Sequence, residues 1–223
     1  MEKSHRLLCF DLDGTILDSY REGLRRLLEI ARSHNLEVDE TILDKIGARW
    51  HKNAFEVINH AWPNANASAI EKEWLELDHK NLLPFIDGAE ETLKKLRKYF
   101  YIGVLTNRSL KSTLRQLEST DGIFDFIYST GREFYKPDPR SMDQVFQKCQ
   151  ELKISRKHIT YVGDIPEVDW RLAKDLKIHF VGILSGVGSR EDFINAGLKE
   201  KNILNSIANI PEFYKVEKII PFR

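Results

Sequence analysis

The sequence has few cysteines and no excess of charge of either sign. Only 2 of its 223 residues are cysteine, which favours small buried side chains in a reducing compartment over a disulfide framework. Lysine and arginine together number 34, as do aspartate and glutamate, so the chain has no basic field to hold a nucleic acid. The balance still allows a small-molecule partner, including a single phosphorylated metabolite.

Long apolar runs are also missing. No segment approaches the roughly 18 apolar residues of a membrane-spanning helix, and the apolar stretch near the N-terminus is too short for a secretory signal. The composition is that of an ordinary globular protein, with 42% hydrophobic and 30% charged residues. We therefore expect no membrane association and a cytoplasmic enzyme or binding domain.

Five short apolar runs, each bounded by polar or turn-forming residues, predict buried strands. They cover residues 7–10, 101–105, 126–129, 159–163 and 179–184. In the second half of the chain, apolar residues between these runs recur at three- or four-residue steps, as on one face of a helix. This alternation predicts an α/β fold with a doubly wound parallel sheet and helices on both faces.

The first half of the chain breaks this rhythm. About ninety residues separate the first two runs, whereas a complete βαβ crossover takes about 30. Residues 88–100 supply the crossover helix, so residues 18–83 are surplus, and they carry helical patterns but no convincing strand. We therefore expect an α/β core made of residues 1–17 and 84–223, with a small all-helical insert at 18–83.

Polar residues that can take part in catalysis or metal binding follow four of the predicted strands. Asp11 and Asp13 follow the first, Thr106 and Asn107 the second, Lys136 the third across a loop, and Asp164 and Asp169 the fourth. These strand ends converge at one edge of a doubly wound sheet. Clustered acids repel one another unless a cation neutralises them, and an all-oxygen ligand set suits Mg²⁺ beside a phosphate.

Taken together, these motifs resemble the haloacid dehalogenase-like hydrolase superfamily. The matching stretches are DLDGT at 11–15, Thr106-Asn107, Lys136-Pro137, and Gly163-Asp164 with Asp169. Their order and spacing match over nearly the whole chain, and the insert looks like the helical C1 cap of phosphoglycolate-phosphatase-like members. The resemblance implies a Rossmann-like core and Mg²⁺-dependent hydrolysis of a phosphate monoester through an aspartyl-phosphate.

The same resemblance assigns roles to the acids. Asp11 would attack phosphorus, and Asp13 would protonate the leaving oxygen and then activate water. The Asp11 carboxylate, the Asp13 backbone carbonyl and Asp164 would hold Mg²⁺. Because Leu12 points to the opposite face of the strand, both Asp11 and Asp13 can face one site.

The resemblance also implies how the substrate is held. Thr106 and the region of Asn107 would grip the phosphoryl group, and Lys136 would neutralise it and orient Asp11. In this family the loop between helices of the cap can face the active site. Arg49 or His51, in the segment IGARWHKN, could therefore read the distal group of the substrate, with a solvent-facing charge as the alternative.

Two positions depart from the common pattern of the superfamily. Ile165 stands after Asp164, where a hydroxyl amino acid is usual, and it removes a possible hydrogen bond. Asp169 follows Asp164 by five residues where four is commoner. We expect Asp169 to support the metal ligands from outside, a role that Glu167 could share.

Three other functions fit parts of this pattern. A dehalogenase of the same fold typically lacks the second acid of the first motif, so Asp13 argues against that reaction. A phosphomutase that isomerises a sugar phosphate would use the same phospho-aspartate and stays open. A signalling receiver domain also gathers acids, a threonine and a lysine around Mg²⁺, but it would be about half as long and would lack the insert.

Overall fold

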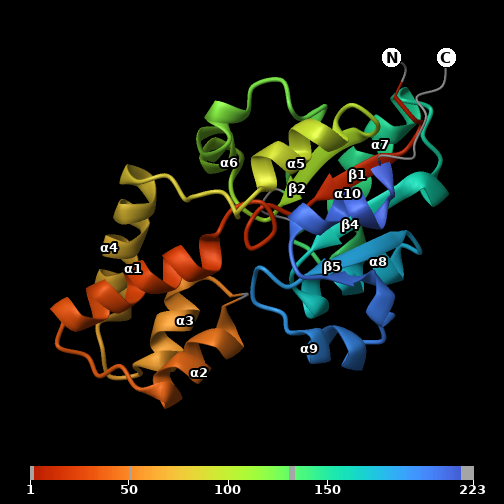
Figure 1. Cartoon of the computed structure of the whole chain (residues 1–223). Helices are drawn as coiled ribbons and strands as arrows, with labels where there is room; N and C mark the ends of the chain where they lie inside the picture. The colour runs from red at the N-terminus through yellow and green to blue at the C-terminus, as the bar shows by residue number, and fades with distance from the viewer. Residues whose placement is uncertain (1–2, 51, 131–133, 217–223) are drawn as a thin grey trace. The chain divides into compact units, whose positions relative to one another are not determined.

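The computed structural model describes residues 3–50, 52–130 and 134–216, which fold as two compact units (Figure 1). The core unit contains the chain up to Asp18 and from Phe85 onward. The helical unit contains Ser19–Pro84. Each unit has its own hydrophobic interior, as a separately folding unit requires.

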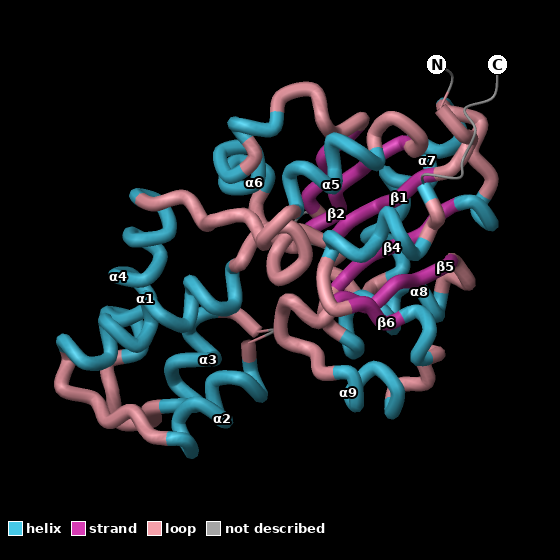
Figure 2. The backbone as a smooth tube through the Cα atoms, viewed as in Figure 1, coloured by secondary structure: helices cyan, strands magenta, loops and turns pink. Residues whose placement is uncertain are grey.

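The core unit is built on one parallel sheet of six strands in the order β3-β2-β1-β4-β5-β6 (Figure 2). The strands are β1 (Leu7–Phe10), β2 (Tyr101–Thr106), β3 (Phe126–Ser129), β4 (Ile159–Gly163), β5 (His179–Ile183) and β6 (Ile203–Leu204). The predicted parallel α/β sheet is confirmed. The sequence pattern missed β6, because a strand of two residues leaves no periodicity to detect.

Strand β1 lies at the centre, and its position makes the sheet doubly wound. Leu7 pairs with Tyr101 of β2 on one side and with Ile159 of β4 on the other. The chain passes outward from β1 through β2 to β3, and then returns across β1 to continue from β4 in the opposite direction. Ligands bind at the carboxyl ends of the strands where the order reverses, which here means the ends of β1, β2 and β4.

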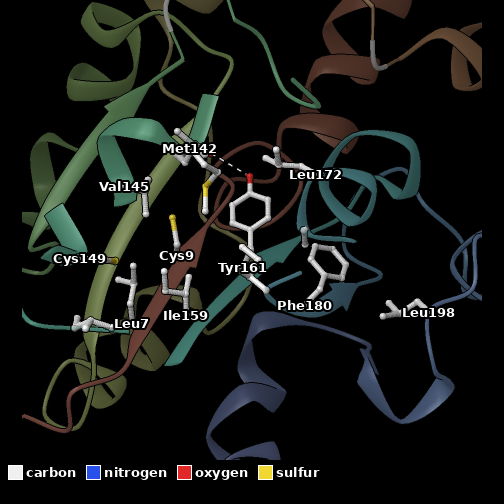
Figure 3. Packing of buried hydrophobic residues seen from close by; sticks show 14 of the residues in the cluster. Leu7, Cys9, Met142, Val145, Cys149, Ile159, Tyr161, Leu172, Phe180 and Leu198 are labelled. Atoms are coloured by element: carbon white, nitrogen blue, oxygen red, sulfur yellow. Dashed lines mark hydrogen bonds between the residues drawn. The ribbon is translucent and has the colours of Figure 1, made fainter. Parts of the chain in front are cut away.

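The interior of the core unit explains why β1 is entirely apolar. All four of its residues are buried, because helices cover both faces of a parallel sheet. Cys9 and Tyr161 on one face pack with Met142, Val145 and other buried side chains (Figure 3). Both cysteines are buried free thiols, which agrees with the expectation that they act as small apolar groups.

Short helices connect the strands of the core unit, and one more follows the last strand. They are α5 (Ala89–Leu96), α6 (Leu110–Gln116), α7 (Asp143–Glu151), α8 (Arg171–Asp175), α9 (Arg190–Asn195) and α10 (Ile210–Phe213). Helix α5 begins after Gly88, whose φ of 75° is accessible to glycine at little cost. It ends at Leu96, earlier than the predicted helix over 88–100, and buries Leu93 and Leu96.

The helical unit contains four helices within its described residues. They are α1 (Ser19–Ser33), α2 (Glu40–Arg49), α3 (Ala54–Ala61) and α4 (Ala67–Lys80). Side-chain caps at Asp39, Asn53 and Asn66 accept backbone N–H groups and fix where α2, α3 and α4 begin. Their apolar faces form one buried cluster that includes Leu27, Ile46, Ile58 and Ile70.

No helix within the described residues is both long enough and apolar enough to pass through a membrane.

Candidate active site

The predicted site residues Asp11 and Asp164 lie at the ends of neighbouring strands. Asp11 directly follows β1 and Asp164 directly follows β4, and the Asp11 N–H donates to the Val162 carbonyl over 2.8 Å. Thr106 ends β2 on the other side of β1 and is 1% exposed. Three adjacent parallel strands therefore deliver these polar side chains to one edge of the sheet, as the sequence predicted.

A buried lysine connects the acids. The Nζ of Lys136 donates to Asp11 Oδ1 over 2.6 Å, to Asp169 Oδ1 over 2.9 Å and to the Tyr161 hydroxyl over 2.8 Å. An ammonium group has three N–H donors, so each of them has an acceptor here. This geometry holds the Asp11 carboxylate in one orientation.

Tyr161 is a site residue that the sequence pattern placed only in a buried strand. Its ring packs in the apolar interior (Figure 3). Its hydroxyl lies 3.1 Å from Asp169 Oδ1 and 3.3 Å from the Leu105 carbonyl. The hydroxyl can donate to either oxygen while it accepts from Lys136. A tyrosine in a hydrophobic run shows no sign in the sequence of which group its hydroxyl meets.

The electrostatics of the site are dominated by burial. Burial raises the pKa of Asp11 to about 7, with Asp169 and Asp13 adding to the rise and Lys136 opposing it. Burial, Asp169 and Asp11 also raise the pKa of Asp164 well above its ordinary value. Burial lowers the pKa of Lys136, but the attraction of Asp11 and Asp169 outweighs it and raises the net value. The site therefore holds more buried carboxylates than buried cations.

The donor set fits a hard divalent cation. Asp11, Asp164 and Asp169 each offer a carboxylate oxygen within 4.8 Å of the others. Asp164 Oδ1 is buried and has no hydrogen-bond partner among the described residues, which is costly for a carboxylate oxygen. A cation bound between Asp11 and Asp164 would satisfy that oxygen and offset the excess negative charge, and oxygen ligands of this kind suit Mg²⁺.

Both carboxylate oxygens of Asp169 accept hydrogen bonds from the protein, and its role as a support of the metal ligands stays a prediction. Its Oδ1 accepts from Lys136 and its Oδ2 accepts from the Ile165 N–H over 3.1 Å. Asp169 lies in a π-helical turn over Pro166–Trp170 that begins two residues after Asp164, and such a turn accommodates one extra residue. The longer spacing therefore still brings Asp169 to Lys136, while Glu167 is exposed.

Asn107 holds the loop that carries Lys136. Its Oδ1 accepts from the Lys136 N–H over 2.9 Å and from the Thr130 hydroxyl over 3.0 Å, and its Nδ2 donates to the Lys136 carbonyl over 3.3 Å. The side-chain amide is thus committed to the backbone of the lysine loop. A contact of the Asn107 region with a phosphoryl group stays a prediction.

Asp13 lies closer to solvent than Asp11 and pairs with a residue to which the sequence gave no role. Its side chain is 33% exposed, and both carboxylate oxygens accept from the guanidinium of Arg108. Arg108 follows Thr106 and Asn107 directly, so its place next to that motif was visible in the sequence. Its partner was not, because 95 residues separate Arg108 from Asp13.

The loop after β5 surrounds Asp164. The Val187 N–H donates to Asp164 Oδ2 over 3.0 Å, and the Gly188 N–H donates to the Asp164 carbonyl over 3.1 Å. A Cβ atom on Gly186 would lie 1.8 Å from Asp164 Oδ2, so only glycine fits there. The sequence pattern gave this loop no role in the site, although its paired glycines, Gly186 and Gly188, were the available signal.

The sequence predicts that Arg49 or His51 of the insert contacts the substrate. Arg49 is exposed at the end of α2 in the helical unit. His51 lies outside the described residues. A role for either in reading a substrate stays a prediction.

Comparison with known protein families identifies the family of the chain. The sequence model of the haloacid dehalogenase-like hydrolase family matches residues 8–183, which include all the acidic residues of the site. The chain belongs to this family. The resemblance seen in the sequence motifs is therefore confirmed, and with it the expectation of a hydrolase.

Solved structures of several relatives share the fold of this hydrolase. A predicted phosphoglycolate phosphatase from Haemophilus somnus matches with a TM-score of 0.73 and 20% identity, over 96% of this chain and 100% of its own. A candidate β-phosphoglucomutase from Thermotoga maritima matches with a TM-score of 0.72 and 17% identity, over 96% of this chain and 100% of its own. A candidate hydrolase of the family from Bacillus subtilis, solved bound to magnesium, gives a TM-score of 0.72 and 17% identity over the same shares. No curated protein sequence matches the chain.

Proposed function

We propose that this protein is a Mg²⁺-dependent phosphatase that hydrolyses a small phosphorylated metabolite through an aspartyl-phosphate on Asp11. The observation that carries the proposal is the buried cluster in which Lys136 fixes Asp11 while Asp164 presents an unpartnered oxygen. Membership of the hydrolase family and the phosphatase named among the structural neighbours support it.

The residues account for both steps of such a reaction. In the first step an oxygen of Asp11 bonds to phosphorus, the ester P–O bond breaks, and Asp13 gives a proton to the leaving oxygen. In the second step water bonds to phosphorus, Asp13 takes its proton, and the bond between phosphorus and Asp11 breaks. Inorganic phosphate leaves and the Asp11 carboxylate is restored.

Neighbouring groups would prepare Asp11 and hold the phosphoryl group. Lys136 orients the nucleophile, and the hydroxyl of Thr106 at the end of β2 is available for a phosphoryl oxygen. The Asp11 carboxylate, Asp164 and the Asp13 carbonyl would hold Mg²⁺, which when bound would neutralise phosphoryl charge. Asp169 and Tyr161 would act through Lys136, which both contact.

The substrate beyond the phosphoryl group is a separate question. We propose that the helical unit serves as the cap and that Arg49 reads the distal part of the substrate. A phosphomutase would use the same Asp11 chemistry, and a candidate β-phosphoglucomutase has the same fold. Release of inorganic phosphate identifies a phosphatase, whereas formation of an isomer identifies a mutase.

We expect Mg²⁺-dependent release of phosphate from p-nitrophenyl phosphate. Exhaustive chelation should abolish it, because Asp11 and Asp164 then lack the cation that offsets their charge, and added Mg²⁺ should restore it. Ca²⁺ should support it poorly, since its larger and looser coordination shell relaxes the octahedral geometry. A phosphate-release assay over a metal series measures this, and activity that survives chelation would disprove the metal assignment.

Gly186→Ala should weaken the response to Mg²⁺. The new methyl group cannot coexist with the Asp164 carboxylate, so either that carboxylate or the loop must move. Changes next to a metal ligand typically cost about 10- to 100-fold in metal affinity. We expect the Mg²⁺ concentration for half-maximal phosphate release to rise by that factor.

Gly197→Ala is the matched control for this change. Unlike Gly186, Gly197 has a positive φ, of 92°, but a Cβ atom there would meet nothing within 4 Å. Alanine should therefore cost about 1 kcal/mol or more of stability through backbone strain alone. The Mg²⁺ response should stay as in the wild type, and an equal shift in both variants would show that a general loss of stability rather than crowding of Asp164 is responsible.

A further inference from the structure

Arg108 and Asp13 form a two-pronged ion pair at the edge of the site. Nη2 of Arg108 lies 2.6 Å from Asp13 Oδ1, and Nε lies 3.1 Å from Asp13 Oδ2. The two side chains are 17% and 33% exposed, so the pair borders solvent, unlike the buried pair of Lys136 and Asp11. Such parallel N–H···O bonds are the geometry in which a guanidinium recognises a carboxylate or a phosphate.

Three further contacts fix where this guanidinium lies. The Arg108 N–H donates to Thr106 Oγ1 over 3.0 Å, and the Arg108 carbonyl accepts from the Ser129 hydroxyl over 2.7 Å. Its Nη1 also donates to the Ser112 hydroxyl over 3.2 Å. Both ends of its peptide backbone are thus held, and the cation is pre-positioned beside Asp13.

The position of Arg108 has a consequence for the leaving group. In the proposed function, on which this inference rests, Asp13 meets the leaving oxygen. A cation in contact with Asp13 therefore lies on the leaving-group side of the phosphoryl site. Lys136 lies on the Asp11 side, and its three donors are already taken by protein acceptors.

We propose that Arg108 selects phosphate monoesters whose leaving group carries a second anionic group, a carboxylate or a phosphate, a few bonds from the ester oxygen. That anion replaces Asp13 in the guanidinium fork, and the Asp13 carboxylate turns to the leaving oxygen. A neutral leaving group has no anion that can replace Asp13 at the guanidinium. Both oxygens of Asp13 therefore stay hydrogen-bonded to Arg108.

Two substrate pairs test this selection. 3-Phosphoglycerate and glycerol 1-phosphate differ by a carboxylate against a hydroxymethyl group. 1,3-Propanediol bisphosphate and 3-hydroxypropyl phosphate differ by a phosphate against a hydroxyl. For at least one pair, the wild type should show a kcat/KM about 10- to 100-fold higher for the anionic member, the range expected of charge-assisted hydrogen bonds.

Arg108→Met should bring that ratio close to one, because it removes the charge and keeps the length of the side chain. Arg108→Lys keeps the charge without the fork and should give an intermediate ratio. Lys111→Met is the matched control, since Lys111 is an exposed cation in the first turn of α6, just after Arg108 in the chain, and its loss should leave the wild-type ratio. An equal fall on both members of each pair in Arg108→Met would mean that Arg108 only positions Asp13, and it would overturn the proposal.

A binding measurement separates this proposal from the proposed function. 3-Phosphonopropionate and propylphosphonate cannot be hydrolysed and differ only by a carboxylate against a methyl group. Calorimetry in Mg²⁺ should show that the wild type binds 3-phosphonopropionate at least about tenfold more tightly than propylphosphonate. Arg108→Met should bind the two compounds equally well. This preference would stand even if no phosphate ester were turned over, whereas its absence alongside turnover of p-nitrophenyl phosphate would overturn the role of Arg108 alone.

Discussion

Replacement of Asp11 with asparagine is expected to abolish phosphate release and to leave the fold intact. The amide keeps the shape of the carboxylate but cannot attack phosphorus, and removal of a nucleophile typically costs roughly 10⁴- to 10⁶-fold in turnover. Lys136 keeps Asp169 and Tyr161 as partners. The loss of one of several mutually repelling buried acids also relieves the charge that raises the pKa of Asp164.

Phosphate release and thermal unfolding in metal-free buffer measure the two halves of this prediction. Asp11→Ala serves as a second variant, because alanine cannot revert to aspartate by deamidation. Asp175→Asn, at an exposed acid of α8, is the control and should keep full activity. Substantial turnover by both Asp11 variants would mean that the phosphoryl group is attacked by another residue or directly by water.

Replacement of Asp13 with asparagine is expected to separate the two chemical steps. As an acid Asp13 helps an alkoxide to leave, but p-nitrophenolate is stable enough to leave with little help. As a base Asp13 must activate the water that cleaves the aspartyl-phosphate, whichever group has left. General acid–base groups contribute about 10²- to 10⁴-fold, so with p-nitrophenyl phosphate the second step should become limiting by a wide margin.

Rapid mixing should then show a burst of p-nitrophenol close to one equivalent per active site, followed by slow turnover. Mass spectrometry of acid-quenched protein should find the phosphate on Asp11, and hydroxylamine should remove it. With an alkyl phosphate the same variant should give no burst, because the first step now lacks its acid. If neither substrate gives a burst and both slow by one factor, Asp13 serves only to position the metal or the loop.

Stability should change little in the Asp13 variant, which makes the kinetic result readable. Asp13 is 33% exposed, and its pair with Arg108 borders solvent, where ion pairs contribute about 1 kcal/mol or less. The neutral amide can still accept a hydrogen bond from the guanidinium. Thermal unfolding of the variant beside the wild type checks this expectation.

Much of the fold was determined by local sequence alone. All five predicted strands agree with the structure to within one residue at each end, because runs such as 7–10 are buried on both faces and are apolar throughout. The fifth, predicted over 179–184, ends at Ile183. The long gap before β2 likewise predicted a helical insert, since a crossover helix needs far fewer residues.

The same local sequence patterns also identified the acids of the candidate site. Asp11 and Asp164 each follow a buried strand directly, and the carboxyl ends of adjacent parallel strands must meet at one edge. Their proximity follows from topology, and topology follows from the alternation of strands and helices. The sequence therefore determined which acids gather, without any knowledge of their distances.

Tertiary structure decided what those acids touch. The sequence left Asp169 and Glu167 open as supports of the metal ligands, and the π-helical turn buries Asp169 against Lys136 while it exposes Glu167. Nor could it give the contacts of Tyr161, because a strand pattern says which face a side chain lies on but not what its polar end meets.

Tertiary structure also decided two other contacts, the ion pair of Arg108 with Asp13 and the enclosure of Asp164 by Gly186. Each joins residues far apart in the chain, at separations where sequence periodicity carries no information. Hydrogen bonds act only when donor and acceptor come within about 3 Å, and a crowded glycine is set by atoms packed from another strand. The sequence by itself determined the hydrolase family and the acids that gather at one edge of the sheet, whereas only the folded chain decided how those acids are oriented, charged and enclosed.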